Sequence, residues 1–305
     1  MQSNVTTENQ APKLTSRDIR ALLAYSGRIP RADSKDWFVN SAGFLVNDRY
    51  GSGLLDVSRL VSLAANWKTV GPLCIASRKR NPVRRLSQNK RKTMQVLLKN
   101  CRKSEKIYAG QTATFTFNIP KAKGYLASES ERKESCMVDS LEIVTIHMQW
   151  VHKHRGHLQV TLVSPGGMTM DLLKPRKLDH FSGSSEVTWK SVMNFGEAGS
   201  GKWKVLVTDT KNSTKRRYQT GCVSHIQLQL HGTEEGEDSF SKNQDLILPH
   251  WTELQKAARN SEESHRLDAE ETATVYDYQR WDALETDVPP KSTGKKGKRK
   301  SHGTA

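Results

Sequence analysis

The chain has 305 residues and a mass of 34.4 kDa, which is long enough for one large domain or two small ones with a buried core. Hydrophobic residues make up 35% and charged residues 26%, and no apolar run approaches the ~20 residues that cross a bilayer. We therefore expect no membrane span. Residues 1–20 also lack the apolar stretch of a secretory signal peptide, so we expect none in this sequence.

The formal net charge of +16 is concentrated in two short runs. Cys74 to Lys106 carries twelve Lys or Arg residues and one acid, and Lys291 to His302 carries six Lys or Arg residues and no acid. Glu234 to Pro290, by contrast, carries fifteen acids and five basic residues. The remaining segments are only mildly basic, so the total charge alone is weak support for nucleic-acid binding.

Residues 1–72 have the pattern of a helix, a hairpin and a second helix. Thr15 with Asp18 three residues later is typical of a capping box, and the helix that it starts is expected to end near Gly27. A short strand is expected at Phe44 to Val46, and helical spacing returns from Leu54 to Trp67. About sixty residues cannot bury so many apolar side chains alone, so this segment is expected to be the edge of a larger domain.

Residues 73–106 are rich in Lys and Arg and show little periodicity, so they are expected to be a linker or insertion. Three interpretations stay open: a solvated loop, a processing site after Arg80 or Arg85, and a nucleic-acid patch. Phosphate binding needs only positive charge, and no aromatic residue interleaves the run for base stacking. Nucleic acid is therefore the least favoured partner.

Apolar and polar residues alternate from Thr112 onward, which predicts half-buried β-strands. Turn sequences separate these runs, so residues 107–234 are expected to form an all-β sandwich or jelly roll. Residues 235–305 are polar and expected to be a mostly disordered tail, with one helix around Trp251 to Ala258. The alternating residues are Phe115, Phe117, Ile119, Val144, Ile146, Met148, Trp150, Leu158, Val160, Leu162, Trp203, Val205, Val207, Ile226, Leu228 and Leu230.

Several motifs in the β segment are more specific than its periodicity: Arg155-Gly156, Ser164-Pro165-Gly166-Gly167 and Gly201-Lys202-Trp203. In order along the chain these motifs resemble the P domain, or homo B domain, of the kexin/furin-like proprotein convertases. The segment from Leu14 to Val70, with Asp36-Trp37 and Tyr50 to Asp56, is similar to the last part of the subtilisin-like catalytic domain of the same family. The residues that carry the P-domain resemblance are Arg155, Gly156, Ser164, Pro165, Gly167, Gly201 and Trp203.

The resemblance implies a mainly β fold: a jelly-roll-like P domain preceded by a helical remnant of a subtilisin-like α/β domain. It also implies calcium-dependent serine endoproteolysis of precursor proteins at paired basic residues, in the Golgi, secretory granules or extracellular space. The P domain would stabilise the catalytic domain, which is its expected partner. The family's Asp, His, Asn and Ser precede the matched segment, so the chain is expected to be inactive, as an incomplete gene product or a short isoform. The alternative is a non-catalytic binding module.

One tripeptide, His231-Gly232-Thr233, matches the phrase around the family's catalytic His. The alternating run from Ile226 leads directly into it, so the end of the last strand is the favoured interpretation. The sequence contains no Gly-Thr-Ser nucleophile phrase, so no catalytic residue is assigned.

The four cysteines, Cys74, Cys101, Cys136 and Cys222, show no zinc-ligand spacing, so neither a zinc site nor any cofactor is expected in this chain. The resemblance implies a disulfide at Cys136. Its expected partner is Cys101, with Cys74 as the alternative. Asn4 and Asn212 lie in glycosylation sequons, which matter only in a secreted protein.

Overall fold

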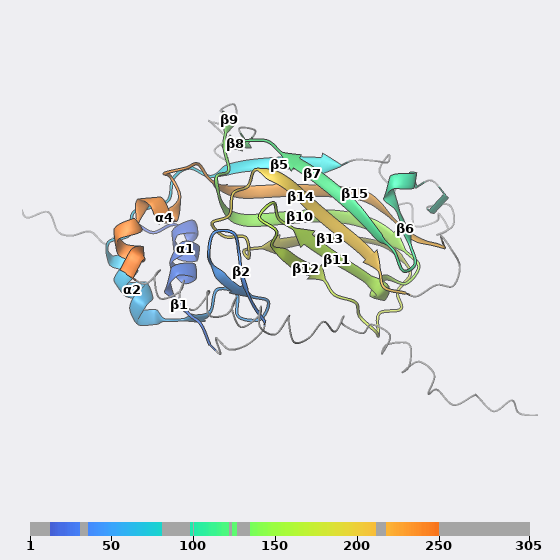
Figure 1. Ribbon diagram of the computed structural model, residues 1–305, viewed down its shortest axis with the longest axis horizontal. Helices are drawn as coiled ribbons and strands as arrows, with labels where there is room; N and C mark the ends of the chain where they lie inside the picture. Colours follow the sequence, from blue (N-terminus) through green and yellow to red (C-terminus); the bar gives the residue numbers. More distant parts are fainter. Residues whose placement is uncertain are drawn as a thin grey trace, which may run out of the picture. The chain divides into compact units, whose positions relative to one another are not determined.

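The computed structural model of the protein describes residues 13–30, 36–80, 98, 99, 101–121, 124–126, 135–211 and 218–249. Two β-sheets face each other, and helices α1, α2 and α4 gather beside them (Figure 1). These residues belong to a first compact unit, Met1–Ser264, whereas the second unit, His265–Ala305, lies outside the described residues. The fold is mainly β, as predicted.

The larger sheet has seven strands in the order β13-β10-β15-β5-β8-β9, with β6 also paired to β15. All of its pairings are antiparallel. Its strands are β5 (Cys74–Arg80), β6 (Lys106–Tyr108), β8 (Gly124–Leu126), β9 (Ser135–Cys136), β10 (Ser140–His152), β13 (Gly183–Ser191) and β15 (Gln219–Thr233).

The smaller sheet has four antiparallel strands in the order β12-β11-β14-β7. They are β7 (Thr112–Ile119), β11 (Leu158–Val163), β12 (Thr169–Leu173) and β14 (Gly201–Asp209). All sixteen apolar residues of the predicted alternating runs are buried, and they belong to one core cluster that both sheets share. Period-two alternation therefore identified the inward face of β7, β10, β11, β14 and β15.

Two helices and a hairpin precede the sandwich, as the sequence predicted, and a short pair of strands that the sequence did not predict encloses the hairpin. Helix α1 (Ser16–Ser26) starts with the capping box of Thr15 and Asp18, and α2 (Val57–Ala65) is capped by Asp56. Between them β1 (Gly27–Arg28) pairs with β4 (Leu54–Leu55), and β2 (Trp37–Val39) pairs with β3 (Leu45–Asn47). Single 3-10 turns occur at η1 (Lys103–Glu105) and η2 (Arg155–His157).

The expected linker begins with a strand instead. β5 pairs with β15 from Cys74 to Arg80 and also with β8, so these residues lie inside the larger sheet. Cys74 and Ala76 are buried, whereas Lys79 and Arg80 are exposed. The small inward residues and the charged end of the strand hid its alternation in the sequence. Arg80 therefore lies in a paired strand rather than in an open loop, and Arg85 lies outside the described residues.

The expected tail also begins with folded structure. Helix α4 (Ser239–Lys242) is capped by Asp238, and residues 244–249 are helical again. Ile247 is buried in the main core cluster, and Phe240 packs against it. The boundary expected at residue 235 is therefore wrong for residues 235–249. The expected helix at 251–258 lies outside the described residues.

The observed disulfide at Cys136 differs from the favoured sequence assignment, and a second disulfide had no assignment. The structure joins Cys74 to Cys136 and Cys101 to Cys222. The pairing of Cys101 with Cys136 is wrong, and the alternative partner Cys74 is the one found. The reason is that β8 pairs with both β5 and β9, so Cys74 and Cys136 come together in one sheet although 62 residues separate them in sequence. Cys101 instead approaches Cys222 of β15.

Candidate functional site

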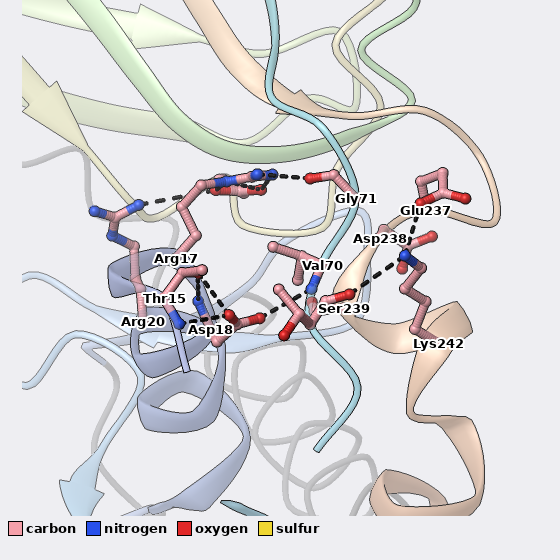
Figure 2. Close-up of polar contacts among 12 residues, drawn as sticks. Thr15, Arg17, Asp18, Arg20, Val70, Gly71, Glu237, Asp238, Ser239 and Lys242 are labelled. Carbon is pink, nitrogen blue, oxygen red and sulfur yellow. Dashed lines mark hydrogen bonds and ion pairs between the residues drawn. The ribbon is translucent and has the colours of Figure 1, made fainter. Parts of the chain in front are cut away.

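The candidate site is the junction between the sandwich and a helical cap, defined as the described residues between 13 and 72 together with 235–249. Asp18 of α1 is fully buried at this junction. Its carboxylate accepts hydrogen bonds from Thr15 N and Oγ1 (2.8 and 2.6 Å), Trp67 Nε1 (3.1 Å) and Val70 N (2.9 Å). Figure 2 shows Asp18 between Thr15 and Val70. One carboxylate therefore fixes both the start of α1 and the chain that leads to β5.

Burial alone would raise the pKa of Asp18, but the hydrogen bonds from Thr15, Val70 and Trp67 outweigh that effect. The pKa of this carboxyl group therefore lies below its usual value. The ionised form is the one that the folded junction stabilises.

Arg17 ties α1 to the first long strand of the sandwich. Its guanidinium forms a charge-assisted pair with Glu142 of β10 and donates from Nη1 to the carbonyl oxygen of Gly71 at 2.6 Å (Figure 2). Glu142 is buried, and Arg20 Nη1 lies 3.9 Å from its Oε2. A bidentate contact of this kind fixes orientation as well as distance. The helix is thereby held in register with the sheet.

A turn at Asn40 and Ser41 makes a second polar contact with the sandwich. Asn40 is buried; its side-chain amide donates to the carbonyl oxygens of Met193 and Phe195 at 3.0 and 2.9 Å. The backbone N–H of Ser41 donates to Oε1 of Glu197 at 2.8 Å. Because these partners lie more than 150 residues away in sequence, no local pattern could have predicted the contact.

The C-terminal part of the cap closes the junction. Asn243 is buried, and its side chain makes two hydrogen bonds to the backbone of Lys68. Its Oδ1 accepts from Lys68 N at 2.7 Å, and its Nδ2 donates to Lys68 O at 2.9 Å. Lys242 pairs with Glu237 at 2.7 Å, as Figure 2 shows. Tyr25 of α1 packs against aromatic rings of the hairpin, the sandwich and α4, with centroid distances of 5.1 to 6.4 Å within the group. These rings are Phe44, Trp67, Phe195 and Phe240.

A cavity of about 450 Å³ opens at this junction. Burial and the nearby charge of Asp238 raise the pKa of Tyr25, although a hydrogen bond to Ser239 opposes them, so the phenol stays protonated. The lining residues of the cavity are Tyr25, Ala42, Phe44, Asp139, Ser140, Gly196, Glu235, Asp238 and Phe240.

The other side of the cap exposes apolar side chains. Ile19 and Leu23 are one turn apart on α1, and Val57 and Val61 are one turn apart on α2. These four residues are 44 to 61% exposed, and with Leu54 and Leu55 of the neighbouring β4 we call them the exposed apolar group. Leu22 of α1 and Leu63 of α2 are instead buried within the chain. Exposed apolar side chains that lie together on a surface are typical of interaction sites.

The residues of the P-domain motifs have structural roles in the sandwich: they form an ion pair, a buried hydrogen bond and a turn. Arg155 pairs with Asp179 at 2.7 Å, and a Cβ at Gly156 would collide with the backbone of Asp179, so only Gly fits there. Trp203 is fully buried and donates to the carbonyl oxygen of Gly199 at 2.9 Å. Ser164, Pro165 and Gly167 form the turn between β11 and β12, and Pro165 packs close to Gly201.

His231 and a buried hydrogen bond between His152 and Asp209 lie elsewhere in the sandwich. His231 lies within β15, opposite Ile75 and Ile143, so the tripeptide at 231–233 belongs to a strand. His152 donates to Asp209 at 3.2 Å, and both are buried at the opposite end of β10. Burial would raise the pKa of Asp209, but hydrogen bonds from His152, Thr220 and Lys211 lower it overall. The 57-residue separation of this pair hid it from sequence analysis.

The described residues include one close group of side chains with metal-binding atoms, Cys101, Glu105 and Cys222. The disulfide uses both sulfur atoms, and calcium takes six to eight oxygen ligands. This group therefore does not fit calcium. Asn4 and Asn212 lie outside the described residues, so their sequons stay predictions.

Comparisons with known proteins agree with this architecture. Residues 141–230 match the family described as the proprotein convertase P-domain. The chain is 30% identical over 227 residues to proprotein convertase subtilisin/kexin type 6 of Rattus norvegicus, covering 73% of this chain and 21% of the relative. A PC3-like endoprotease (variant B) of Hydra vulgaris is 29% identical over 202 residues, covering 66% and 24%. The matched segment thus spans about a quarter or less of these relatives.

A solved structure shows the same fold. The crystal structure of the serine protease of Aeromonas sobria with its chaperone ORF2 matches 73% of this chain and 41% of that chain, with a TM-score of 0.54 and 21% identity. Residues 141–230 therefore match a P domain, and the helical cap shares the hydrophobic core of the same sandwich. The chain is similar to the kexin/furin-like proprotein convertases, which confirms the resemblance of its motifs. No helix of the described residues is long and apolar enough to cross a membrane.

Proposed function

We propose that this chain acts as the P-domain part of a proprotein-convertase-type serine endopeptidase, where it binds and stabilises a subtilisin-like catalytic domain. The single observation that carries this proposal is the exposed apolar group of the cap. Polar contacts hold the cap rigidly on the sandwich, so the group presents a preformed surface. Burying apolar area is worth roughly 25 cal/mol per Å², which favours a protein partner.

The peptide-bond chemistry of such an enzyme would belong to the catalytic domain. That domain would cleave precursor proteins after paired basic residues, and it would hold the calcium that the resemblance implies. The 305 residues contain no Gly-Thr-Ser nucleophile phrase, so this chain alone should not form an acyl-enzyme. The chain would act in the secretory pathway. The two disulfides support this location, since they persist in oxidising compartments.

The experiment mixes the purified chain with the catalytic domain of a subtilisin/kexin-type convertase that lacks its own P domain. We expect the chain alone not to cleave an Arg-x-Lys-Arg reporter peptide, and we expect it to raise the melting temperature and the activity lifetime of the catalytic domain. Charge at the exposed apolar group should abolish both gains, because an unpaired charge would be buried on binding. The variants are Leu23→Glu and Leu55→Glu.

The matched control is Leu178→Glu, which changes a leucine that is 92% exposed on a loop of the sandwich. This variant should bind like the parent chain. Equal binding by all three variants, or no stabilisation by the parent, would contradict the docking role and favour a free binding module. Calcium-dependent cleavage of the reporter by the chain alone would contradict its inactivity.

A further inference from the structure

The loop between β12 and β13 exposes a leucine at its tip. Residues 174–182 form this loop, and Leu178, at its middle, is 92% exposed. It is the most exposed large apolar side chain among the described residues, and the next, Val57, is 61% exposed. Phe181, three residues further along the loop, is 50% exposed. Such side chains gain the free energy of burial only when an apolar partner covers them.

Backbone hydrogen bonds to the η2 turn hold the loop in this shape. The N–H of Gly156 donates to the carbonyl oxygen of Asp179 at 3.1 Å, and the N–H of Arg176 donates to the carbonyl oxygen of Gly156 at 2.7 Å. The N–H of Arg155 donates to the carbonyl oxygen of Phe181 at 3.0 Å. Because Gly156 has no side chain, the two segments can approach this closely. The tip is therefore preformed, so little conformational entropy is lost when a partner binds it.

The acid of the loop is paired with two arginines. Nε of Arg155 donates to both carboxylate oxygens of Asp179, at 2.9 and 2.7 Å, and Nη2 of Arg176 lies 2.8 Å from Oδ2 of the same group. The guanidinium of Arg155 also lies over the ring of Phe181, 4.5 Å from its centroid. Two positive charges therefore offset the one negative charge, and the loop keeps a positive balance.

Further basic side chains lie around the tip. Lys177 directly precedes the leucine and is exposed. The backbone N–H of Thr210 donates to the carbonyl oxygen of His157 at 2.9 Å, so the chain after β14 lies beside the same η2 turn. It places the exposed Lys211 there, whereas the neighbouring Asp209 is buried and does not face the solvent. This end of the sandwich therefore presents positive charge around an apolar tip.

We propose that the loop 174–182 docks the protein on an anionic lipid bilayer. Leu178 enters the boundary between headgroups and acyl chains, and the surrounding Lys and Arg side chains bind the acidic headgroups. A soluble polyanion would match the positive charge equally well, but it would leave the leucine in water. The combination of an apolar tip with a basic surround therefore favours a lipid surface.

This docking surface lies away from the helical cap. Strand β10 runs from Glu142, which contacts the cap, to His152, which pairs with Gly183 directly after the loop. His152 also pairs with Gly221 of β15, next to β6, which marks this end of the sandwich in Figure 1. The inference therefore does not depend on the proposed convertase role, and both surfaces can be occupied together.

The first test places a polarity-sensitive nitrobenzoxadiazole dye at the tip, on the Leu178→Cys variant of the full chain with its disulfides intact. With vesicles of phosphatidylcholine and phosphatidylserine we expect the emission to brighten and to shift to shorter wavelength, because the dye leaves water. Vesicles of phosphatidylcholine alone should give little change. The matched control carries the same dye on Leu55→Cys, at a leucine of the cap that is 52% exposed. Its emission should stay that of a dye in water.

The second test measures the affinity of the unlabelled chain for the anionic vesicles by co-sedimentation. Leu178→Ser should weaken binding roughly tenfold, since it removes the inserted apolar side chain. Lys211→Gln should weaken it about fivefold, the effect of one basic residue at an anionic surface. Leu55→Ser should bind like the parent. All three side chains are exposed, so the variants should also melt like the parent.

Three results would overturn the proposal. An unchanged emission of the dye at position 178 would show that the tip stays in water. Equal losses in Leu178→Ser and Leu55→Ser would show that binding does not depend on this loop. Binding that salt abolishes but Leu178→Ser leaves unchanged would show attraction of a polyanion through charge alone.

Discussion

At the scale of single residues, the junction depends on polar groups whose partners are distant in sequence. The sequence predicted the capping box of Thr15 and Asp18 because the two residues are three apart. It did not predict that Asp18 also accepts from Trp67 and Val70, since those contacts exist only after the chain folds back. Local hydrogen bonds leave a pattern in sequence, whereas long-range ones do not.

Replacing Asp18 by Asn should lower the free energy of unfolding by about 2 to 3 kcal/mol at pH 7, because hydrogen bonds to a charged group are each worth about 1.5 to 3 kcal/mol and are not additive. The folded pKa of Asp18 is lowered, so its contribution is fully present above the unfolded value of about 3.9. It is lost as the pH falls through the folded pKa. The difference between parent and variant should therefore shrink below about pH 4.

Urea unfolding at several pH values measures this difference, with Asp48→Asn as the matched control. Asp48 forms an exposed ion pair with Lys174, and such pairs contribute about 0 to 1 kcal/mol. If both Asn variants lose equally little stability, or if the loss at Asp18 does not change with pH, the buried carboxylate does not have the role assigned to it.

At the scale of secondary-structure elements, strong alternation of apolar residues predicted five strands of the two sheets, whereas the weak alternation of β5 hid that strand. The inward side chains of β5 include the small Cys74 and Ala76, and its end is basic. Arg80 lies opposite Ile226, and its guanidinium lies over the ring of Phe115 at 5.8 Å. The aliphatic part of an arginine can cover apolar surface in this way, so a charged residue can end a core strand.

The pairing of β5 changes the expected result of digestion by a furin-like enzyme. The sequence predicted cleavage after Arg80 or Arg85, but a protease binds its substrate as an extended, unpaired chain. Arg80 pairs with Ile226, so the sheet must open locally before cleavage. We expect little cleavage after Arg80 compared with an unfolded peptide that spans residues 74–92. Intact mass measured over time decides this question.

The control for that digestion is the chain with its disulfides reduced, because Cys74–Cys136 joins β5 to β9. Reduction should speed cleavage after Arg80 by loosening the strand. Cleavage after Arg80 at the peptide's rate in the oxidised chain would show that β5 is not stably paired.

At the scale of the whole molecule, cap and sandwich share one hydrophobic core. Leu22, Tyr25, Phe44 and Trp67 belong to the same buried cluster as the strands of the sandwich. The sequence predicted that residues 1–72 could not bury their apolar faces alone, and the structure shows that the sandwich and residues 235–249 bury one side of them. The sequence did not predict that residues 235–249 pack on the core. The few apolar residues that make this contact are scattered among many polar ones, so they form no recognisable pattern.

This shared core predicts how fragments of the chain should behave. A fragment of residues 13–249 should unfold in one cooperative transition, whereas residues 12–72 alone should not, because the partners of Tyr25 and Trp67 would be missing. A fragment of residues 107–234 was expected from the sequence to be an autonomous β domain. It lacks β5 and the two cysteines Cys74 and Cys101, so it should be much less stable than residues 73–249.

The comparison of residues 107–234 with residues 73–249 isolates the part of the chain that holds the sandwich together. Each disulfide is worth about 2 to 4 kcal/mol, and without β5 the strand β15 has an unpaired edge from Ile226 to Gly232. Calorimetry and circular dichroism should therefore show a broad or absent transition for 107–234 and a sharp one for 73–249. If 107–234 matched the larger fragment in stability, β5 would be an accessory strand. Cooperative melting of 12–72 alone would likewise show that the cap folds without the sandwich.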